Sequence, residues 1–248
     1  MKVLAFTNQK GGVGKSTTAQ SVGAYLIKQG QRVLFIDLDA QGNLTYCMNA
    51  KPAKTVYGVF TGEATAAEAI THTEQGDLIA SNKLLAAADT ILEGTGREYK
   101  LKEALEEIQD KYDYVILDSP PALSILTINA LTAATDVIIP AQADAFSLQG
   151  LNDLRGTIES VRKYCNPALK IDGIVFTRYN QRATLSRELT DLAEKIAQTL
   201  STKVYNTKIR ECTAIKEAQL QKQSIFDYAA KSNGAADYEA LAQEILKE

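Results

Sequence analysis

The sequence predicts an α/β fold: a doubly wound, mostly parallel β-sheet with helices on both faces. Short β-rich runs alternate along the chain with longer amphipathic stretches, which is the order expected of successive βαβ units. Two of the short runs, 115–118 and 137–140, are almost continuously apolar, as expected for strands that helices cover on both sides. A chain of 248 residues, 45% of them hydrophobic, can bury a full core. Since no repeat, low-complexity tract or linker-like segment interrupts it, we expect a single domain over residues 1–248.

Apolar periodicity and turn signals place the individual elements. The expected strands are residues 3–7, 32–37, 77–80, 114–118, 137–140, 171–176 and 203–205. The expected helices are residues 15–29, 101–111, 124–134, 148–164, 184–200, 213–221 and 235–246. Gly30 suits the left-handed conformation with which the first helix would end. Residues 48–69 are rich in small side chains and are expected to form short helical turns.

Composition excludes several classes of protein. A net charge of -3 argues against a protein that is basic overall, but is compatible with one basic face. Cys47, Cys165 and Cys212 lie far apart with no Cys-x-x-Cys pair, which argues against disulfides and thiolate zinc sites. The single histidine, His72, disfavours a histidine metal site and a Ser-His-Asp triad. The sequence shows neither a signal peptide nor a membrane-length apolar run, so we expect a cytoplasmic protein.

The strongest chemical signal is a glycine-rich segment between the first expected strand and the first expected helix. Its residues are Lys10, Gly11, Gly12, Val13, Gly14, Lys15, Ser16 and Thr17. Glycines here let backbone N–H groups curl around an anion, and the positive end of the helix dipole points at it. We therefore expect a nucleotide-binding phosphate loop, in which Lys15 reaches the β- and γ-phosphates and Ser16 binds Mg²⁺. Thr17 is placed to donate to the α-phosphate.

Acidic residues follow two further expected strands. Asp37 and Asp39 end the second strand, and Asp118 ends the strand 114–118. The carboxyl ends of parallel strands face the crevice in which such sheets bind ligands. We expect Asp118 to hold Mg²⁺ through water, and Asp37 is a candidate for supporting the same ion. Asp39 is expected to position or deprotonate an attacking water, which makes it, with Lys15, a candidate catalytic residue for ATP hydrolysis.

Together these segments resemble the ParA/MinD family of ATPases with a deviant phosphate loop, and the resemblance runs over nearly the whole chain. Residues 10–17 are similar to the family's phosphate loop, 37–43 to its switch I, and 118–121 to its Walker B and switch II segments. The Asp-Leu-Asp-Ala-Gln-Gly-Asn form of 37–43 resembles the ParA/Soj partition branch more than MinD, whereas 176–180 is locally MinD-like. The implied fold is a P-loop NTPase.

The resemblance also implies a homodimer that forms on ATP binding and encloses two nucleotides. Lys10 would then cross the interface as a catalytic residue and add charge at the partner's phosphates, much as an arginine finger does. Gly12 would let the two loops approach, because a Cβ there would clash. Asp144 stands where relatives often carry a glutamate that contacts the partner's nucleotide. Turnover is expected to be slow without a stimulating partner, since nothing beyond Asp39 obviously activates water.

Basic residues gather in two stretches in spite of the acidic total. Residues 170–187 hold four basic side chains and one acidic one, and residues 203–222 hold five basic and two acidic ones. Such a band suits sequence-independent contacts with DNA phosphates. In the partition branch this region binds DNA. By resemblance and by charge, the candidate contacts are Arg182, Lys208, Arg210 and Lys216.

The sequence thus predicts an ATPase that segregates plasmid, mobile-element or chromosomal DNA, working in the cytoplasm on the nucleoid. A ParB-type or other centromere-binding protein would stimulate hydrolysis and release it from DNA. The alternative is a MinD-like regulator that cycles on membranes, which needs a basic amphipathic C-terminal helix. Residues 240–248 hold two acidic side chains and one basic one, so no membrane partner is expected. Arg178 either stacks on the adenine or is a plain surface or interface arginine.

Overall fold

The structure, a computed structural model, describes residues 1–180 and 184–247. Its strands are β1 (Lys2–Phe6), β2 (Val33–Asp37), β3 (Ile70–Thr73), β4 (Gly76–Ile79), β5 (Tyr114–Asp118), β6 (Asp136–Gln142) and β7 (Lys170–Thr177). The first helices are α1 (Lys15–Lys28), α2 (Asn43–Cys47), α3 (Val56–Thr61), α4 (Ala66–Ala69), the 3₁₀-helix η1 (Lys83–Ala87) and α5 (Ala88–Ile91). The later ones are α6 (Lys100–Glu106), α7 (Ile125–Ala133), α8 (Ala145–Tyr164), α9 (Thr184–Thr199), α10 (Thr213–Leu220), α11 (Ile225–Tyr228) and α12 (Asn233–Leu246).

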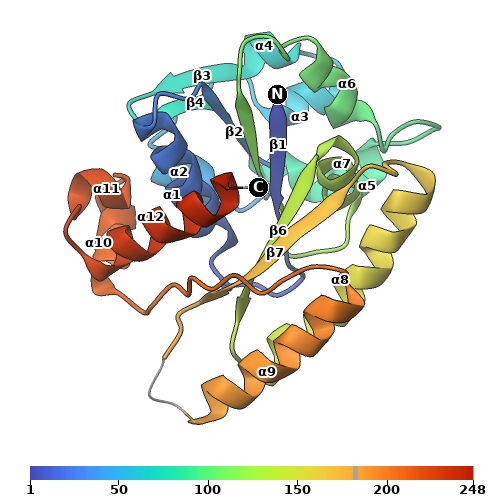
Figure 1. Cartoon of the computed structure of the whole chain (residues 1–248). Helices are drawn as coiled ribbons and strands as arrows, with labels where there is room; N and C mark the ends of the chain where they lie inside the picture. Colours follow the sequence, from blue (N-terminus) through green and yellow to red (C-terminus); the bar gives the residue numbers. More distant parts are fainter. Residues whose placement is uncertain (181–183, 248) are drawn as a thin grey trace.

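The strands form one sheet in the order β3-β4-β2-β5-β1-β6-β7, and every pair is parallel except β3 with β4. Figure 1 shows helices on both faces of this sheet. The predicted doubly wound α/β fold is therefore confirmed. β1 lies between β5 and β6 in this order. The strands β2 to β5 all lie on one side of β1, and the later strands β6 and β7 lie on its other side, so the strand order reverses at β1. In such folds the loop after this strand opens onto the ligand-binding crevice.

Two apolar layers hold the helices to the sheet. Successive residues of a strand point to opposite faces, and β1 shows this directly. Val3 and Ala5 pack in the layer that includes α6, α7 and α8. Leu4 and Phe6 pack in the layer that includes α1 and α12. Because both faces are covered, the central strands are buried and read as apolar runs in the sequence.

Most predicted elements are present with ends shifted by a few residues, but some predictions differ from the structure. The strand expected at 203–205 is wrong: only Val204 bridges to Ile174, so this segment follows the edge of β7 without becoming a regular strand. The sequence does not predict the antiparallel strand β3, nor the short helices α2, η1, α5 and α11. Residues 48–69 do contain short helical segments, α3 and α4. Among the described residues, no helix has the length and apolar character needed to cross a membrane.

Gly23 lets α1 lie close against the sheet. A Cβ at this position would lie 2.2 Å from the ring of Phe35 and 3.3 Å from Ile116. We expect Gly23→Ala to destabilise the fold by about 1–3 kcal/mol through overpacking, although alanine favours a helix by ~1 kcal/mol. Gly156→Ala in α8 is the matched control, because a Cβ there meets nothing within 4 Å. Urea unfolding measures both, and equal effects of the two substitutions would contradict the close-packing argument.

Candidate functional site

The glycine-rich loop joins the end of β1 to the start of α1. Gly12 and Gly14 adopt left-handed backbone conformations, with φ of 76° and 84°, which an L side chain rarely adopts. Gly14 stands at the N-cap of α1 and brings no side chain to cap the helix. The N-terminal amides of α1 are thus left for an anion, at the positive end of the helix dipole. This arrangement matches the phosphate loop that the sequence predicts.

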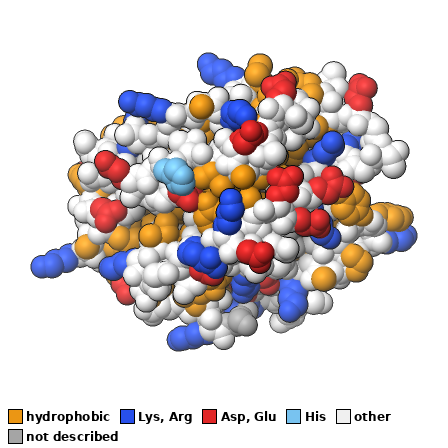
Figure 2. Space-filling view, turned by 90° about the horizontal axis from the view of Figure 1, so that it is seen from above, with side chains coloured by type: hydrophobic (Ala, Val, Ile, Leu, Met, Phe, Trp, Pro, Cys, Tyr) orange, Lys and Arg blue, Asp and Glu red, His pale blue; other side chains and the backbone are white. Residues whose placement is uncertain are grey.

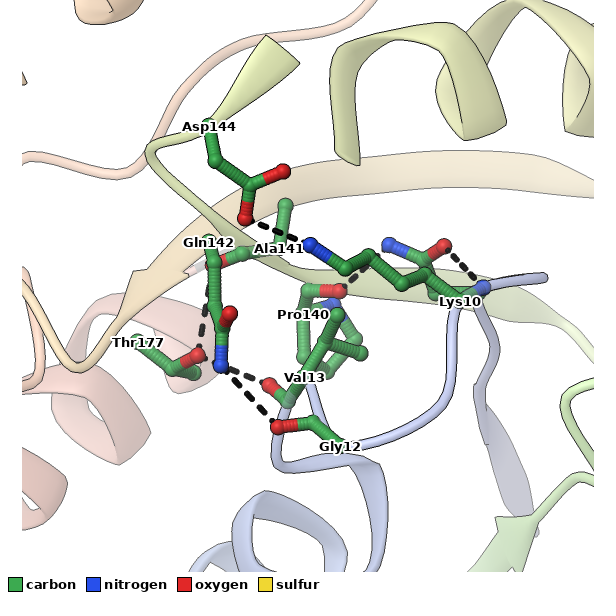
Figure 3. Close-up of polar contacts among 9 residues, drawn as sticks. Lys10, Gly12, Val13, Pro140, Ala141, Gln142, Asp144 and Thr177 are labelled. Atoms are coloured by element: carbon green, nitrogen blue, oxygen red, sulfur yellow. Dashed lines mark hydrogen bonds and ion pairs between the residues drawn. The ribbon is translucent and has the colours of Figure 1, made fainter. Parts of the chain in front are cut away.

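Three polar side chains tie this loop to β6 and β7 (Figure 3). The amide of Asn8 donates to the carbonyl oxygen of Pro140 at 2.7 Å. The amide of Gln142 donates to the carbonyl oxygen of Gly12 at 3.0 Å. The hydroxyl of Thr177 donates to the carbonyl oxygen of Val13 at 2.7 Å. The loop is therefore held in shape from strands that lie more than a hundred residues further along the chain.

Lys10 pairs with Asp144 inside the same chain. Its ammonium nitrogen lies 2.6 Å from Asp144 Oδ2, and about a third of each side chain is exposed (Figure 3). The structure thus brings together the two residues for which the sequence implies roles at a dimer interface. Within one chain they contact each other.

Lys15 is buried beneath the loop, where its ammonium donates to the carbonyl oxygen of Lys10 at 3.2 Å. Burial lowers the pKa of Lys15, and the negative charges of Asp118 and Asp39 act in the opposite direction. A desolvated cation that faces the cleft is most stable beside an anion. This placement agrees with a lysine that binds phosphate.

Asp37 and Asp118 end the neighbouring strands β2 and β5 and are paired in register. Both are fully buried. Thr45 donates to Asp37 Oδ2 through its backbone N–H, at 2.8 Å, and through its hydroxyl, at 2.7 Å. Neither carboxyl oxygen of Asp118 has a hydrogen-bond partner of normal geometry among the described residues. Asp118 is therefore a buried acceptor for which the Ser16 hydroxyl and the Lys15 ammonium are the nearby donors, without a hydrogen bond of normal geometry.

The two carboxyl groups have strongly perturbed acidities. Burial raises the pKa of Asp37 to about 6, against the hydrogen bonds from Thr45. Burial and the charge of Asp37 also raise the pKa of Asp118 well above its usual range, while Ser16 and Lys15 oppose the rise. A Mg²⁺ ion would stabilise both as carboxylates and would neutralise phosphate charge. The orphaned oxygens of Asp118 and the nearby hydroxyl of Ser16 fit such an ion.

Asp39 lies at the start of the segment that follows β2 and lines the cleft. Its backbone N–H donates to Asp37 Oδ1 at 3.1 Å, and its Oδ1 accepts from the N–H of Gln41 at 3.0 Å. The hydroxyl of Ser81, just after β4, donates to the carbonyl oxygen of Asp39. The backbone of Asp39 is thus fixed from two sides, which suits a residue that must hold a small reactant in place.

An open cleft of about 720 Å³ lies beside the loop. It is lined by Gly14, Lys15 and Ser16 of the loop, by Arg178, and by a later group of residues: Ile209, Arg210, Glu211, Cys212, Ile215, Lys216, Gln219 and Leu220. This volume is within the range of small-molecule sites. On α10, the amide of Gln219 donates to the hydroxyl of Thr17 at 2.7 Å. Arg178 stands exposed at the end of β7 with a left-handed φ of 49°.

The residues predicted to bind DNA do not form one group. Lys208 lies with its ammonium 5.0 Å from the ring centre of Tyr179, outside the residues that line the cleft. Arg210 and Lys216 line the cleft, and each is paired with an acidic residue. Arg182 lies outside the described residues.

Several residues that shape this site are not predicted as site residues from the sequence. They are Asn8, Thr45, Ser81, Gln142, Thr177, Gln219 and Asp237. Apart from Thr45, which lies eight residues from its partner Asp37, they act through hydrogen bonds between segments that are distant in sequence. The one local signal available was Asn8, which immediately precedes the glycine-rich segment.

A phosphate loop at the point where the strand order of a parallel sheet reverses defines the class of P-loop nucleoside triphosphatases. Comparison with known proteins narrows the class. A protein-family model described as an AAA domain matches residues 1–171. The chromosome-partitioning ATPase Soj of Treponema pallidum is 39% identical over 248 residues, which cover 99% of this chain and 97% of Soj. The chain belongs to the ParA/Soj family of ATPases.

Two further proteins support this assignment. The sporulation initiation inhibitor protein Soj of Bacillus subtilis is 39% identical over 250 residues, which cover 98% of each chain. Cobyrinic acid a,c-diamide synthase from Mycobacterium smegmatis, solved with a bound ATP analogue and magnesium, superposes with a TM-score of 0.86. It is 37% identical, and the match covers 100% of this chain and 95% of the synthase. The predicted family, fold and ATPase class are thereby confirmed.

The cysteines offer a chemical test of the cleft. Burial raises the pKa of the Cys47 thiol to about 11, and its side chain is 8% exposed, so at neutral pH it should resist alkylation. Cys165 and Cys212 are partly exposed, and Cys212 lines the cleft. We expect maleimide to label Cys165 and Cys212 in the folded protein, and Mg·ATP to slow labelling of Cys212 alone. Peptide mapping by mass spectrometry reads this out, and rapid labelling of Cys47 or equal protection of Cys165 would contradict it.

Proposed function

We propose that this chain binds ATP with Mg²⁺, closes into a homodimer over two nucleotides, and binds DNA without sequence preference in that state. A partner that stimulates hydrolysis, expected to be a ParB-type or other centromere-binding protein, then releases it. The task is segregation of DNA, carried out in the cytoplasm on the nucleoid. The name of the Treponema relative, a chromosome-partitioning ATPase, supports a role in DNA segregation, and the Bacillus relative is also named Soj. The synthase structure, which holds an ATP analogue and magnesium, supports ATP and Mg²⁺ as ligands.

The main observation in favour of a dimer is that the two glycines in the middle of the phosphate loop are exposed. Gly11 and Gly12 are exposed, and a Cβ on either would meet nothing within 4 Å in this chain. The φ of 76° gives a conformational reason for glycine at Gly12, but Gly11 has no such reason. Neither packing nor backbone geometry within one copy therefore requires glycine at position 11. Close approach of a second molecule supplies that requirement.

The ion pair of Lys10 with Asp144 is compatible with a role of Lys10 across the interface. Both side chains are partly exposed, and pairs of this kind contribute about 0–1 kcal/mol. Lys10 can therefore leave the carboxylate of Asp144 at little cost in free energy. In exchange, its ammonium group would bind the triphosphate of the partner, which is a more highly charged anion. In this proposal Lys10 leaves Asp144 when the dimer closes.

The proposed DNA contacts are Lys208, Lys216 and Arg182. Lys208 lies in the segment between α9 and α10, Lys216 lies in α10, and Lys216 pairs with Glu211 at 3.1 Å in an exposed position. DNA phosphates could take the place of that carboxylate at small cost. Figure 2, seen from above Figure 1, shows a face on which basic and acidic side chains are mixed.

Dimerisation is tested by light scattering with Mg²⁺ and a non-hydrolysable ATP analogue. We expect the parent chain to dimerise, and Gly12→Val still to bind the analogue, though more weakly because its φ of 76° disfavours valine, but to stay monomeric at saturating analogue. Gly62→Val is the matched control, because Gly62 has a similar φ of 79° and open space around its Cβ, away from the loop. It should dimerise like the parent. A parent chain that stays monomeric at saturating analogue refutes the proposal.

DNA binding is tested with random duplex DNA at a series of salt concentrations. With ATP and Mg²⁺, we expect affinity to fall steeply with salt, and Lys208→Ala with Lys216→Ala to lower the salt slope by about one unit each. Liposomes of anionic lipid provide the control. Binding to lipid but not to DNA would favour the membrane-cycling alternative.

The fold gives a reason to prefer DNA over a membrane. An amphipathic helix binds a membrane through an apolar face that is free to insert. In the C-terminal helix α12 the apolar residues Tyr238, Leu241 and Ile245 are buried against the sheet layer that contains α1. The face that would enter a bilayer is thus already used in the core.

A further inference from the structure

Arg210 occupies a fixed place on the wall of the nucleotide cleft. The backbone N–H of Ile209 donates to Phe176 at 2.8 Å, and the N–H of Tyr179 donates to Ile209 at 2.9 Å. These bonds align the segment around Arg210 with the end of β7 and form a bridge between Tyr179 and Arg210. Arg210 therefore lines the same cleft as the phosphate loop, next to Arg178.

Asp237 holds the guanidinium of Arg210 in one orientation. Arg210 Nη2 donates to Asp237 Oδ1 at 2.6 Å, and Nε donates to Oδ2 at 2.9 Å. The backbone N–H of Arg210 also donates to Oδ2, at 3.0 Å. Asp237 lies near the start of α12 and is 9% exposed, so this carboxylate is committed to one arginine. A fork-to-fork pair of this kind fixes the plane as well as the position of the guanidinium.

The pair is poorly suited to bind DNA. Its two charges cancel, so it adds little to the attraction of a polyanion. One donor edge of the guanidinium is already occupied by Asp237. The Arg210 side chain lines the cleft and is still 42% exposed, so part of this flat, delocalised cation remains accessible to a ligand. Such planes stack well on nucleobases, because each base offers a π-face to a cation.

We propose that Arg210, held by Asp237, is the platform on which the base of the bound nucleotide stacks. The phosphate loop fixes the triphosphate at one end of the cleft, and the wall formed by Arg210 lies where the rest of the nucleotide must go. This inference rests on the proposed ATP site. It gives Arg210 a role in nucleotide binding in place of the DNA contact that the sequence suggested.

The test compares a ligand with a base and one without. Calorimetry with Mg²⁺ measures binding of ATP and of inorganic tripolyphosphate. We expect Arg210→Ala to weaken ATP binding about tenfold, in the range found for loss of a base-stacking side chain, and to leave tripolyphosphate binding within about twofold of the parent. Arg210→Lys, which keeps the charge but not the plane, should behave like Arg210→Ala.

A second variant tests whether any loss of ATP binding in Arg210→Ala comes from misfolding. Arg210→Ala leaves Asp237 buried without its partner, so the double substitution Arg210→Ala/Asp237→Ala removes both charges and should show the same selective loss for ATP. An equal loss for ATP and tripolyphosphate would overturn the stacking role, and so would unchanged ATP affinity with weakened DNA binding. A parent chain that binds neither ligand would instead refute the ATP site itself.

Discussion

Replacing Lys15 by alanine is expected to abolish useful ATP binding. Lys15 is buried in the cleft, and burial lowers its pKa in spite of the nearby negative charges of Asp118 and Asp39. A triphosphate would balance the charge of Lys15 through short, charge-assisted hydrogen bonds. The loss of such bonds to a charged group is expected to cost ~3 kcal/mol, or about 100-fold in affinity.

Calorimetry with Mg·ATP measures the effect. Lys28→Ala is a matched control, because Lys28 lies in the last turn of the same helix, is exposed, and is far from the loop in sequence. It should bind ATP like the parent. Thermal melting without nucleotide checks that Lys15→Ala is folded. If the folded variant kept the affinity of the parent, the buried lysine would have no role in holding the phosphates.

The phosphate loop could be predicted from sequence because its chemistry is local. Glycines, lysine and hydroxyls stand together between a strand and a helix, and the structure keeps that order around α1. The same holds for Asp37 and Asp118, which directly end two apolar strands and become neighbours once the strands pair in register. A parallel sheet brings such strand ends to one edge wherever they lie in the chain.

The contacts that shape the site could not be predicted, because they join distant segments through side chains that carry no periodic signal. Gln142 reaches Gly12, and Gln219 reaches Thr17, across 130 and 202 residues of sequence. An amide can bond to many partners, so its presence in a sequence does not name one. Asp237 illustrates the same point: in sequence it is one of several acidic residues near the C-terminus, and in the fold it holds Arg210.

The errors in secondary structure have a related cause. Three of the four residues of the edge strand β3 (Ile70–Thr73) are polar, and it pairs only with β4, so it lacks the apolar run by which the central strands are recognised. The residues at 203–205 show the reverse case. Val204 and Tyr205 look like part of a strand, but the segment bonds to β7 around Ile174 alone and then continues as an irregular edge. Periodicity reports the burial of a segment, and the extent of its pairing depends on its neighbours.

Asp39→Ala is expected to lower the hydrolysis rate by about 10²–10⁴-fold while ATP binding persists, which is the range for removal of a general base. Asp39 lines the cleft, and its backbone is fixed by Asp37 and Ser81, so we expect its carboxylate to act on the water that attacks the nucleotide and not to be needed for binding it. If dimers form on ATP and part after hydrolysis, the variant should also accumulate as a dimer. Phosphate release and light scattering measure the two effects.

Asp39→Asn separates chemistry from positioning. The asparagine keeps the shape of the side chain and an oxygen that can accept from the N–H of Gln41, but it cannot take a proton from water. If Asp39 acts through its charge, Asp39→Asn should be as slow as Asp39→Ala, and both should bind ATP like the parent. An asparagine variant that hydrolyses ATP at the parent rate would show that Asp39 only orders the loop after β2. Loss of ATP binding in both variants would place Asp39 among the groups that hold the nucleotide and would remove the reason to expect a long-lived dimer.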